Sequence, residues 1–193
     1  MAAWTATQPT FIMPYTDHRL DVDVSRGIHN ERAVEPLYNL YWRRLTDTCC
    51  AKGDWPRCRD AATRAMPPSR RHVASTVAGG LVLDVGANFG YYALYAATLG
   101  CRVVAWEPVP TFRAFLRLGA ALNNVSHRLH VRDAVASNVS GNEVTICVPE
   151  RGIWGTASVG CLNVDPSYKS GRYEVKVRRR RRRHRRHRRH RRH

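Results

Sequence analysis

The chain has 193 residues and a net charge of +17, from 32 Lys and Arg residues against 15 Asp and Glu residues. This is the length of one ordinary domain with short additions. Twelve of the Arg residues lie in residues 178–193, so 20 basic and 15 acidic residues remain in residues 1–177. The globular part is therefore only mildly basic, and its charge alone does not mark it as a nucleic-acid-binding domain.

The cysteines and the N-terminus carry little information about the compartment. The chain has six cysteines: Cys49, Cys50, Cys58, Cys101, Cys147 and Cys161. They form no C-x-x-C pair and no zinc-type Cys/His spacing, and they are too sparse for a disulfide scaffold, so we expect ordinary thiols. The start, MAAWTATQPTFIMPYTDHR, lacks the basic beginning and the long apolar run of a signal peptide. The compartment stays open, with the cytoplasm as the default.

The N-terminal third, residues 1–72, predicts helices. Residues 31–47, ERAVEPLYNLYWRRLTD, place apolar side chains at helical spacing, at Leu37, Leu40, Tyr41 and Leu45. Residues 55–68, WPRCRDAATRAMPP, predict a second helix that ends at the proline pair. Aromatic clusters of this kind belong more often to a core than to a binding site, so we expect these residues to be buried.

The middle of the chain alternates between strand and helix patterns. Three short apolar runs predict buried strands: GLVLDVG (80–86), CRVVAWEP (101–108) and HRLHVRDAVAS (127–137). Between them, residues 88–100 predict a helix closed by Gly100, and residues 109–124 predict an amphipathic helix with Phe112, Phe115, Leu116 and Gly119 on one face. This alternation predicts a βαβαβ unit with a parallel sheet.

Residues 74–101 are also apolar enough to suggest a membrane helix. Such a helix would bury Asp84 and Asn88 near the bilayer centre, where a central Asp costs roughly 2.5 to 3.5 kcal/mol on insertion scales. Its five glycines would weaken the helix further. We therefore expect no transmembrane segment.

The residues at the ends of the predicted strands are the candidates for function, because ligands bind at the carboxyl ends of parallel strands. Gly86 and Gly90 permit a sharp turn and a close backbone approach, and the helix that follows favours an anionic group at its N-terminus. Glu107 ends the second strand, where an acid can accept both hydrogen bonds of a ribose diol. Asp133 ends the third strand. This arrangement indicates a nucleoside-containing cofactor.

The glycine turn distinguishes between cofactors. A dinucleotide fingerprint is G-x-G-x-x-G, whereas this turn reads Gly86-Ala-Asn-Phe-Gly90, with Asp84 two positions before the first glycine. A carboxylate there would repel a pyrophosphate and attract the cationic methionine portion of S-adenosylmethionine. The pattern favours S-adenosylmethionine over NAD.

The segment VLDVGANFGYYAL…RVVAWEPVPTFRAFLRLGAALNN resembles the FkbM-type family of class I S-adenosylmethionine-dependent methyltransferases. The family's first motif is matched at Asp84, Gly86, Ala87, Asn88 and Gly90, and the second at Glu107 and Pro108. In VRDAVAS, Asp133 and Ala134 resemble the third motif and would border the adenine ring. The resemblance implies that these nine residues bind the cofactor.

The resemblance further implies a Rossmann-like α/β domain over residues 73–177, with N-terminal helices that cover the sheet and cap the cleft. It implies O-methylation of a small molecule or sugar. The family continues into a fourth parallel strand with a Lys-x-Asp-x-Glu-Gly segment that this sequence lacks, so we expect an incomplete domain. No catalytic base can be named, because His127 and His130 lie at the wrong end of the third strand and are expected on the surface.

Residues 178–193, RRRRRRHRRHRRHRRH, admit two interpretations. Arginines without acids predict a disordered tail that binds nucleic acid without sequence preference, and no aromatic residue offers a stacking platform. A strict triplet repeat is also what simple-sequence DNA or an incorrect reading frame would produce, and we favour such an artefact or a disordered tail without function. Two alternatives to a methyltransferase remain: a cofactor-binding fragment without catalysis, and a nucleic-acid-binding protein that acts through this tail.

Overall fold

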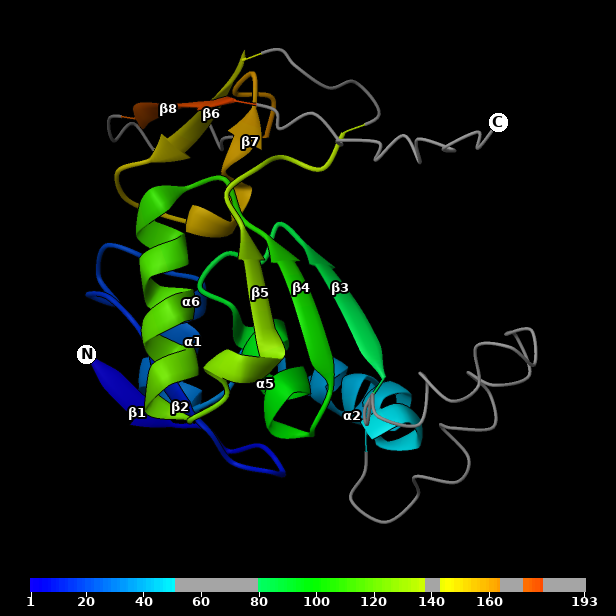
Figure 1. Cartoon of the computed structure of the whole chain (residues 1–193). Coiled ribbons are helices and arrows are strands. Elements are labelled where there is room, and N and C mark those ends of the chain that lie inside the picture. Colours follow the sequence, from blue (N-terminus) through cyan, green and yellow to red (C-terminus); the bar gives the residue numbers. More distant parts are fainter. Residues whose placement is uncertain (51–79, 138–142, 164–171, 179–193) are drawn as a thin grey trace, which may run out of the picture.

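The computed structural model describes residues 1–50, 80–137, 143–163 and 172–178 (Figure 1). At its centre lies a sheet of three parallel strands in the order β3-β4-β5. The strands are β3 (Leu81–Val85), β4 (Arg102–Trp106) and β5 (Leu129–Arg132). Helix α5 (Tyr91–Thr98) connects β3 to β4, and α6 (Pro110–Leu122) connects β4 to β5. The predicted α/β class and βαβαβ unit are confirmed.

The two connecting helices differ in how they are buried. The predicted stripe of α6 is buried at Phe112, Leu116 and Gly119, so only one side of this helix faces the sheet. Helix α5 is buried on almost every side and ends before Gly100, whose φ of 103° is the left-handed conformation expected of a closing glycine. A helix that is apolar all round needs a second covering layer.

That second layer is an N-terminal β-hairpin of β1 (Ala2–Trp4) and β2 (Ile12–Pro14), in a region whose sequence predicted only helices. Phe11 lies against the rings of Tyr91 and Tyr95, with centroids 5.5 and 5.7 Å away. The Asn123 amide extends β2 like a strand, accepting from the Ile12 N–H and donating to its carbonyl, both at 2.7 Å. Three-residue strands are too short to show alternation in a sequence.

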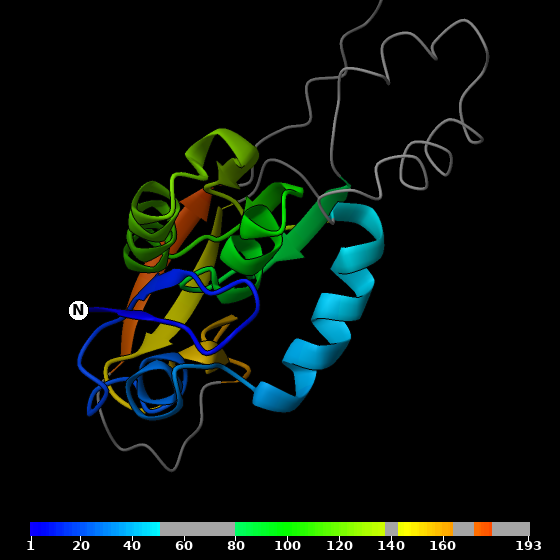
Figure 2. The same ribbon diagram turned by 90° about the horizontal axis from the view of Figure 1, so that it is seen from below.

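Two helices follow the hairpin, α1 (Val24–Glu31) and α2 (Pro36–Cys50). The predicted helix α2 is confirmed, but the expected burial of its apolar residues is wrong. Its large exposed side chains, with exposed fractions of 62 to 78%, are Leu37, Tyr38, Leu40, Tyr41 and Leu45. The helix contacts α5 through another side: Asn39 donates to the Tyr91 hydroxyl at 3.0 Å, and Trp42 packs on Tyr92. Figure 2 shows α2 in light blue along one side of the described chain. The helix predicted over residues 55–68 lies outside the described residues.

The chain after β5 forms a second, antiparallel sheet in the order β7-β6-β8. Its strands are β6 (Glu143–Pro149), β7 (Ser158–Val159) and β8 (Arg172–Arg178). Cys147 on β6 forms a disulfide with Cys161, just after β7, and Cys101 is disulfide-bonded as well. The expectation that all cysteines are ordinary thiols is therefore wrong. Antiparallel pairing sets Cys147 opposite Ser158, and so brings residues 14 positions apart within bonding distance.

Several remaining expectations can be compared with the structure. The expectation of a buried strand is wrong for β3: Leu81, Leu83 and Val85 are 57 to 63% exposed, because no described element covers the sheet face to which they point. His127 and His130 are exposed, as expected. None of the helices in the described ranges has the length and apolar character needed to cross a membrane. The Arg/His tail after Arg178 lies outside the described residues.

Candidate functional site

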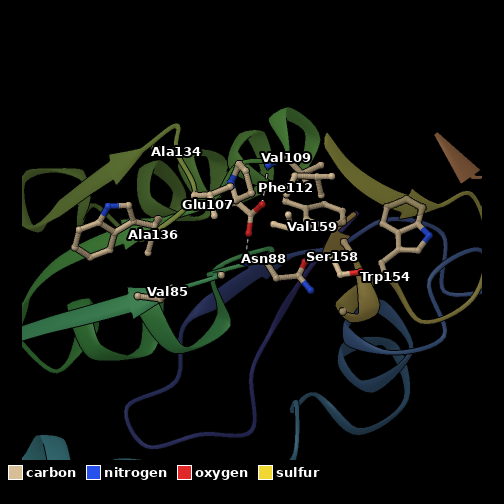
Figure 3. Close-up of a pocket in the computed structure, with 17 residues that line it drawn as sticks. Val85, Asn88, Glu107, Val109, Phe112, Ala134, Ala136, Trp154, Ser158 and Val159 are labelled. Atoms are coloured by element: carbon tan, nitrogen blue, oxygen red, sulfur yellow. Dashed lines mark hydrogen bonds between the residues drawn. The ribbon is translucent and has the colours of Figure 1, made fainter. Parts of the chain in front are cut away.

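Two cavities meet at the carboxyl ends of β3 and β4. The larger, of about 230 Å³, lies between this end of the sheet and residues from β6 to β7 (Figure 3). The smaller, of about 170 Å³, lies between the turn after β3 and the N-terminal helices α1 and α2. Gly86 and Asn88 line both cavities. The predicted glycine turn thus forms a wall that the two cavities share, and we call the two cavities together the divided site.

The two glycines of the turn serve different purposes. Gly86 has a φ of +78°, and a Cβ added to it would meet no atom within 4 Å, so its backbone faces open space where a ligand can approach. Gly90 has a φ of +89°, but a Cβ there would collide with the Leu116 side chain on α6. Gly90 therefore permits the packing of α6 rather than the approach of a ligand.

Most amide groups of this turn already have partners. The N–H groups of Gly86 and Ala87 both donate to the Trp106 carbonyl, at 2.9 and 3.1 Å. The Asn88 N–H donates to Glu107 Oε2 at 2.7 Å. The expectation that this helix N-terminus presents its free amides to an anion is wrong for these three residues. A phosphate at the turn would find no cradle in them.

Glu107 ties the turn to the start of α6. It is 3% exposed, and its Oε1 accepts the Val109 N–H at 2.8 Å while Oε2 accepts that of Asn88 (Figure 3). Burial raises the pKa of Glu107 to about 7, and these two hydrogen bonds and the Arg113 guanidinium limit the rise. Two backbone donors fix the position of the carboxylate. Each of its oxygens can still accept a further hydrogen bond from a ligand in the larger cavity.

Asp84 occupies the floor of the smaller cavity. One carboxylate oxygen accepts the Ala93 N–H in the first turn of α5, and Oδ2 is buried without a hydrogen-bond partner in the described chain. Burial raises the pKa of Asp84 to about 6. The residue therefore interacts with the first turn of α5 and leaves one buried oxygen uncompensated.

Two further acids line the smaller cavity, and sequence reasoning missed both. Asp23 precedes α1, and its pKa is raised by burial and by the nearby Asp21 and Glu35 carboxylates. Glu35 lies just before α2, and its Oε2 accepts the Tyr92 hydroxyl at 2.7 Å. Among the described residues that line this cavity, none is Lys, Arg or His. The smaller cavity is thus suited to a cationic group.

The far wall of the larger cavity was also missed from the sequence. Trp154, in the short 3₁₀ turn between β6 and β7, stacks on Phe112 with ring centroids 5.8 Å apart and meets Phe89 edge-on at 5.9 Å. A Cβ on Gly155 would lie 2.6 Å from an Asp23 oxygen, so this turn also approaches the smaller cavity. The only sequence signal was an aromatic residue between glycines, which does not reveal where it packs.

The structure brings seven of the nine predicted cofactor residues together. Gly86, Asn88, Glu107, Pro108 and Ala134 line the larger cavity, and Asp84, Gly86, Ala87 and Asn88 line the smaller one. Gly90 and Asp133 line neither cavity. Asp133 is exposed at the end of β5, and its charge acts on Arg113.

Comparisons with known proteins give no assignment. No family model matches the chain, and no curated protein does. Among solved structures, PH0793, a proposed transferase from Pyrococcus horikoshii, is 32% identical over 29% of this chain and 22% of its own, with a TM-score of 0.28. TehB from Haemophilus influenzae is 25% identical over 42% of this chain and 28% of its own, with a TM-score of 0.28. The chain spans less than a third of either protein, and likenesses this weak carry no argument about function.

Proposed function

We propose that the two joined cavities bind S-adenosylmethionine and that the protein is an S-adenosylmethionine-dependent methyltransferase. The observation that carries the proposal is the divided site itself. A buried, oriented carboxylate at the end of β4 lines one cavity, three acids line the other, and Gly86, which lines both, has open space where a side chain would lie. A ligand that fits has a hydroxyl-bearing part at one end and a cationic part at the other.

The larger cavity suits a nucleoside. Glu107 is held by two backbone donors and can accept hydrogen bonds from both ribose hydroxyls. The cavity walls are largely apolar, with Pro108 and Ala134 on one side and Ile146 and Val159 on another. Walls of this kind with one fixed polar group are typical of sites for a small organic ligand.

The smaller cavity suits the charged end of the same molecule. The carboxylates of Asp23, Glu35 and Asp84 attract a cation and repel a pyrophosphate, and three amides of the turn are already engaged. Buried polar atoms without partners in the described chain, Asp84 Oδ2 and Asn88 Oδ1, mark places where a ligand can complete hydrogen bonding. These features favour S-adenosylmethionine over a dinucleotide.

The chemistry follows from holding and enclosing this ligand. When bound, S-adenosylmethionine supplies an electrophilic methyl group on a cationic sulfur. The contribution of this chain is alignment and exclusion of water, because methyl transfer depends mainly on placing the acceptor in line. The FkbM type, and a hydroxyl of a small molecule or sugar as acceptor, are part of the proposal and derive from the motif resemblance.

Calorimetric titration tests the proposal. We expect wild-type protein to bind S-adenosylmethionine and S-adenosylhomocysteine and not NAD⁺. Equal binding of NAD⁺, or no binding of S-adenosylmethionine by folded protein, would contradict it. Incubation with methyl-labelled S-adenosylmethionine and a panel of sugars and hydroxylated small molecules then separates an active enzyme from a binding protein without catalysis.

A further inference from the structure

The wall of the larger cavity is closed by a covalent link. The disulfide between Cys147 and Cys161 joins two residues 14 positions apart. The segment between them carries Trp154, Gly155 and Val159, which line the cavity. Any change in the disulfide therefore acts on the wall directly.

Besides the disulfide, a short strand pairing and the hydrogen bond from the Gly160 N–H to the Thr145 carbonyl, at 3.0 Å, hold the end of this segment. Strand β7 pairs with β6 through two residue pairs only, Ile146 with Val159 and Cys147 with Ser158. At its middle, the segment is anchored by the Trp154 ring against Phe112 and Phe89. The aromatic anchor thus holds the middle of the cavity wall, and the disulfide holds the end at β7.

The two cysteines differ in their exposure to solvent. Cys147 is fully buried, at 0% exposure, whereas Cys161 is partly exposed. Cys161 lies in a turn with φ of 63°, next to Gly160 and to Leu162, which is 85% exposed. Of the two cysteines, Cys161 is therefore the one that a reductant is expected to approach from solvent.

We propose that the Cys147–Cys161 disulfide is a reversible redox site that sets how tightly the larger cavity holds its ligand. A dithiol reductant attacks Cys161 Sγ through its thiolate, the S–S bond breaks, and Cys147 Sγ takes up a proton. The second thiol of the reductant then attacks the mixed disulfide and releases Cys161 as a thiol. Two electrons and two protons enter the protein, and the reductant leaves as a disulfide.

Reduction should loosen the wall and weaken binding. A cross-link over a loop of this size restricts the chain, and its loss lets the β7 end sample positions that do not close the cavity. This step rests on the proposed function, because the ligand used to measure it is S-adenosylmethionine. We expect the affinity for S-adenosylmethionine to fall about tenfold on reduction. This loss is smaller than the full stabilisation that a disulfide over a loop of this size supplies.

The variant Cys161→Ser isolates this disulfide, because Cys101 is disulfide-bonded as well and a reductant opens both. We expect the variant to bind like reduced wild type and to be insensitive to reductant. Leu162→Ser, in the same exposed turn, is the matched control and should keep the wild-type response. If Cys161→Ser instead binds like oxidised wild type and loses affinity about tenfold only when reductant is added, the effect belongs to the Cys101 disulfide and the proposal is overturned.

A second measurement does not depend on the cofactor. Amide hydrogen exchange over residues 152–163 should be faster in reduced wild type and in Cys161→Ser than in oxidised wild type and Leu162→Ser. All samples contain a chelator, because the Cys147 and Cys161 sulfurs and a Glu174 oxygen lie within 4.8 Å of one another and such a set can hold zinc. Unchanged exchange overturns the redox proposal, whereas altered exchange without S-adenosylmethionine binding overturns only the proposed function.

Discussion

The two cavities share the glycine turn but differ in how they would recognise a ligand. The larger has one acid among mostly apolar walls, and both oxygens of that acid, Glu107, are held by backbone donors. The smaller has three acids, and Asp84 keeps one buried oxygen without a partner in the described chain. In the proposed function, the larger cavity would recognise its ligand by fixed geometry and the smaller one by charge.

This difference separates two kinds of mutational effect. Changes at Glu107 should act on the nucleoside end, through hydrogen bonds that need a fixed direction. Changes at Asp84 should act on the cationic end, through an attraction that depends weakly on direction and that salt screens. Changes at Gly86 should act on both, because it lies in both walls.

The largest expected effect is that of Gly86→Val, which should remove detectable binding, a loss of more than about 100-fold. Valine resists the left-handed conformation at φ of +78°, and its side chain would fill the open space before the turn. Backbone strain of this kind costs on the order of 1–3 kcal/mol of stability. Titration of S-adenosylmethionine, beside a thermal melt, measures both changes.

Gly160→Val is the matched control for that substitution. Gly160 has a φ of +63° and also has nothing within 4 Å of an added Cβ, but it lines neither cavity. We expect a similar loss of stability with a far smaller loss of affinity. If Gly86→Val folds and binds normally, Gly86 is only a permissive turn.

The second prediction concerns the nucleoside end. Glu107→Ala removes the proposed ribose acceptor, and losing charged hydrogen bonds costs about 1.5 to 3 kcal/mol, which is roughly 10- to 150-fold in affinity. The buried amides of Asn88 and Val109 would also lose their acceptor, so stability should fall. Glu143→Ala, at an exposed acid on β6, controls for loss of charge. Equal binding by Glu107→Ala and wild type would separate Glu107 from recognition.

The third prediction is a pH dependence with opposite signs for stability and binding. Because the pKa of Glu107 is raised to about 7, the folded protein binds more protons than the unfolded chain between about pH 4.3 and 7. Stability without ligand should therefore fall as pH rises through that window. Binding needs the ionised carboxylate, so affinity should fall about tenfold from about pH 8 to about pH 6.

Melting temperatures and calorimetric affinities at the two pH values measure both trends. Glu107→Gln is the control, because glutamine keeps one acceptor and does not titrate. Its affinity should change little between the two pH values. Wild-type affinity that rises on acidification would contradict the assignment of Glu107 as an ionised acceptor.

The elements that sequence predicted best are those whose signals are local. Each parallel strand is a short apolar run, and strand ends in a parallel sheet share one edge, so the sequence alone could place Asp84, Gly86 and Glu107 near one another. Asp133 shows the limit of this rule. It ends a strand of the same sheet yet is exposed outside both cavities.

The residues that sequence missed reach the site through long-range packing. Asp23 and Glu35 approach the turn only because the N-terminal segment folds back over α5, and Trp154 only because β6 and β7 return to the sheet ends. The Cys147–Cys161 pairing likewise depends on strand register. The apolar residues of α2 fit a helical period, but the period does not say whether another element covers them.

The last prediction concerns the cationic end and has the smallest expected effect on binding. Asp84→Asn should weaken the binding of S-adenosylmethionine about three- to tenfold. It removes one of the three carboxylates that line the cavity, and the attraction of each for a cation is partly screened. S-adenosylhomocysteine lacks the sulfonium charge, so its affinity should fall less. The same loss of affinity for both ligands would show that Asp84 acts through its hydrogen bond to the first turn of α5 rather than through its charge.

The same substitution should stabilise the protein without ligand. An acid whose pKa is raised on folding destabilises the fold when ionised, and for Asp84 this penalty grows as pH rises toward about 6 and is constant above. Asparagine keeps an acceptor for the Ala93 N–H and puts an uncharged group in place of the unpartnered oxygen. At about pH 8 the gain in stability should be on the order of 1–2 kcal/mol, and it should vanish near pH 4, where Asp84 is itself neutral.

Denaturant unfolding of wild type and Asp84→Asn at the two pH values measures the difference. A variant that is less stable at both pH values would contradict this prediction. It would mean that the charge of Asp84 stabilises the N-terminus of α5 by more than its burial destabilises the fold. A cationic ligand in the smaller cavity would then relieve no penalty of burying this charge.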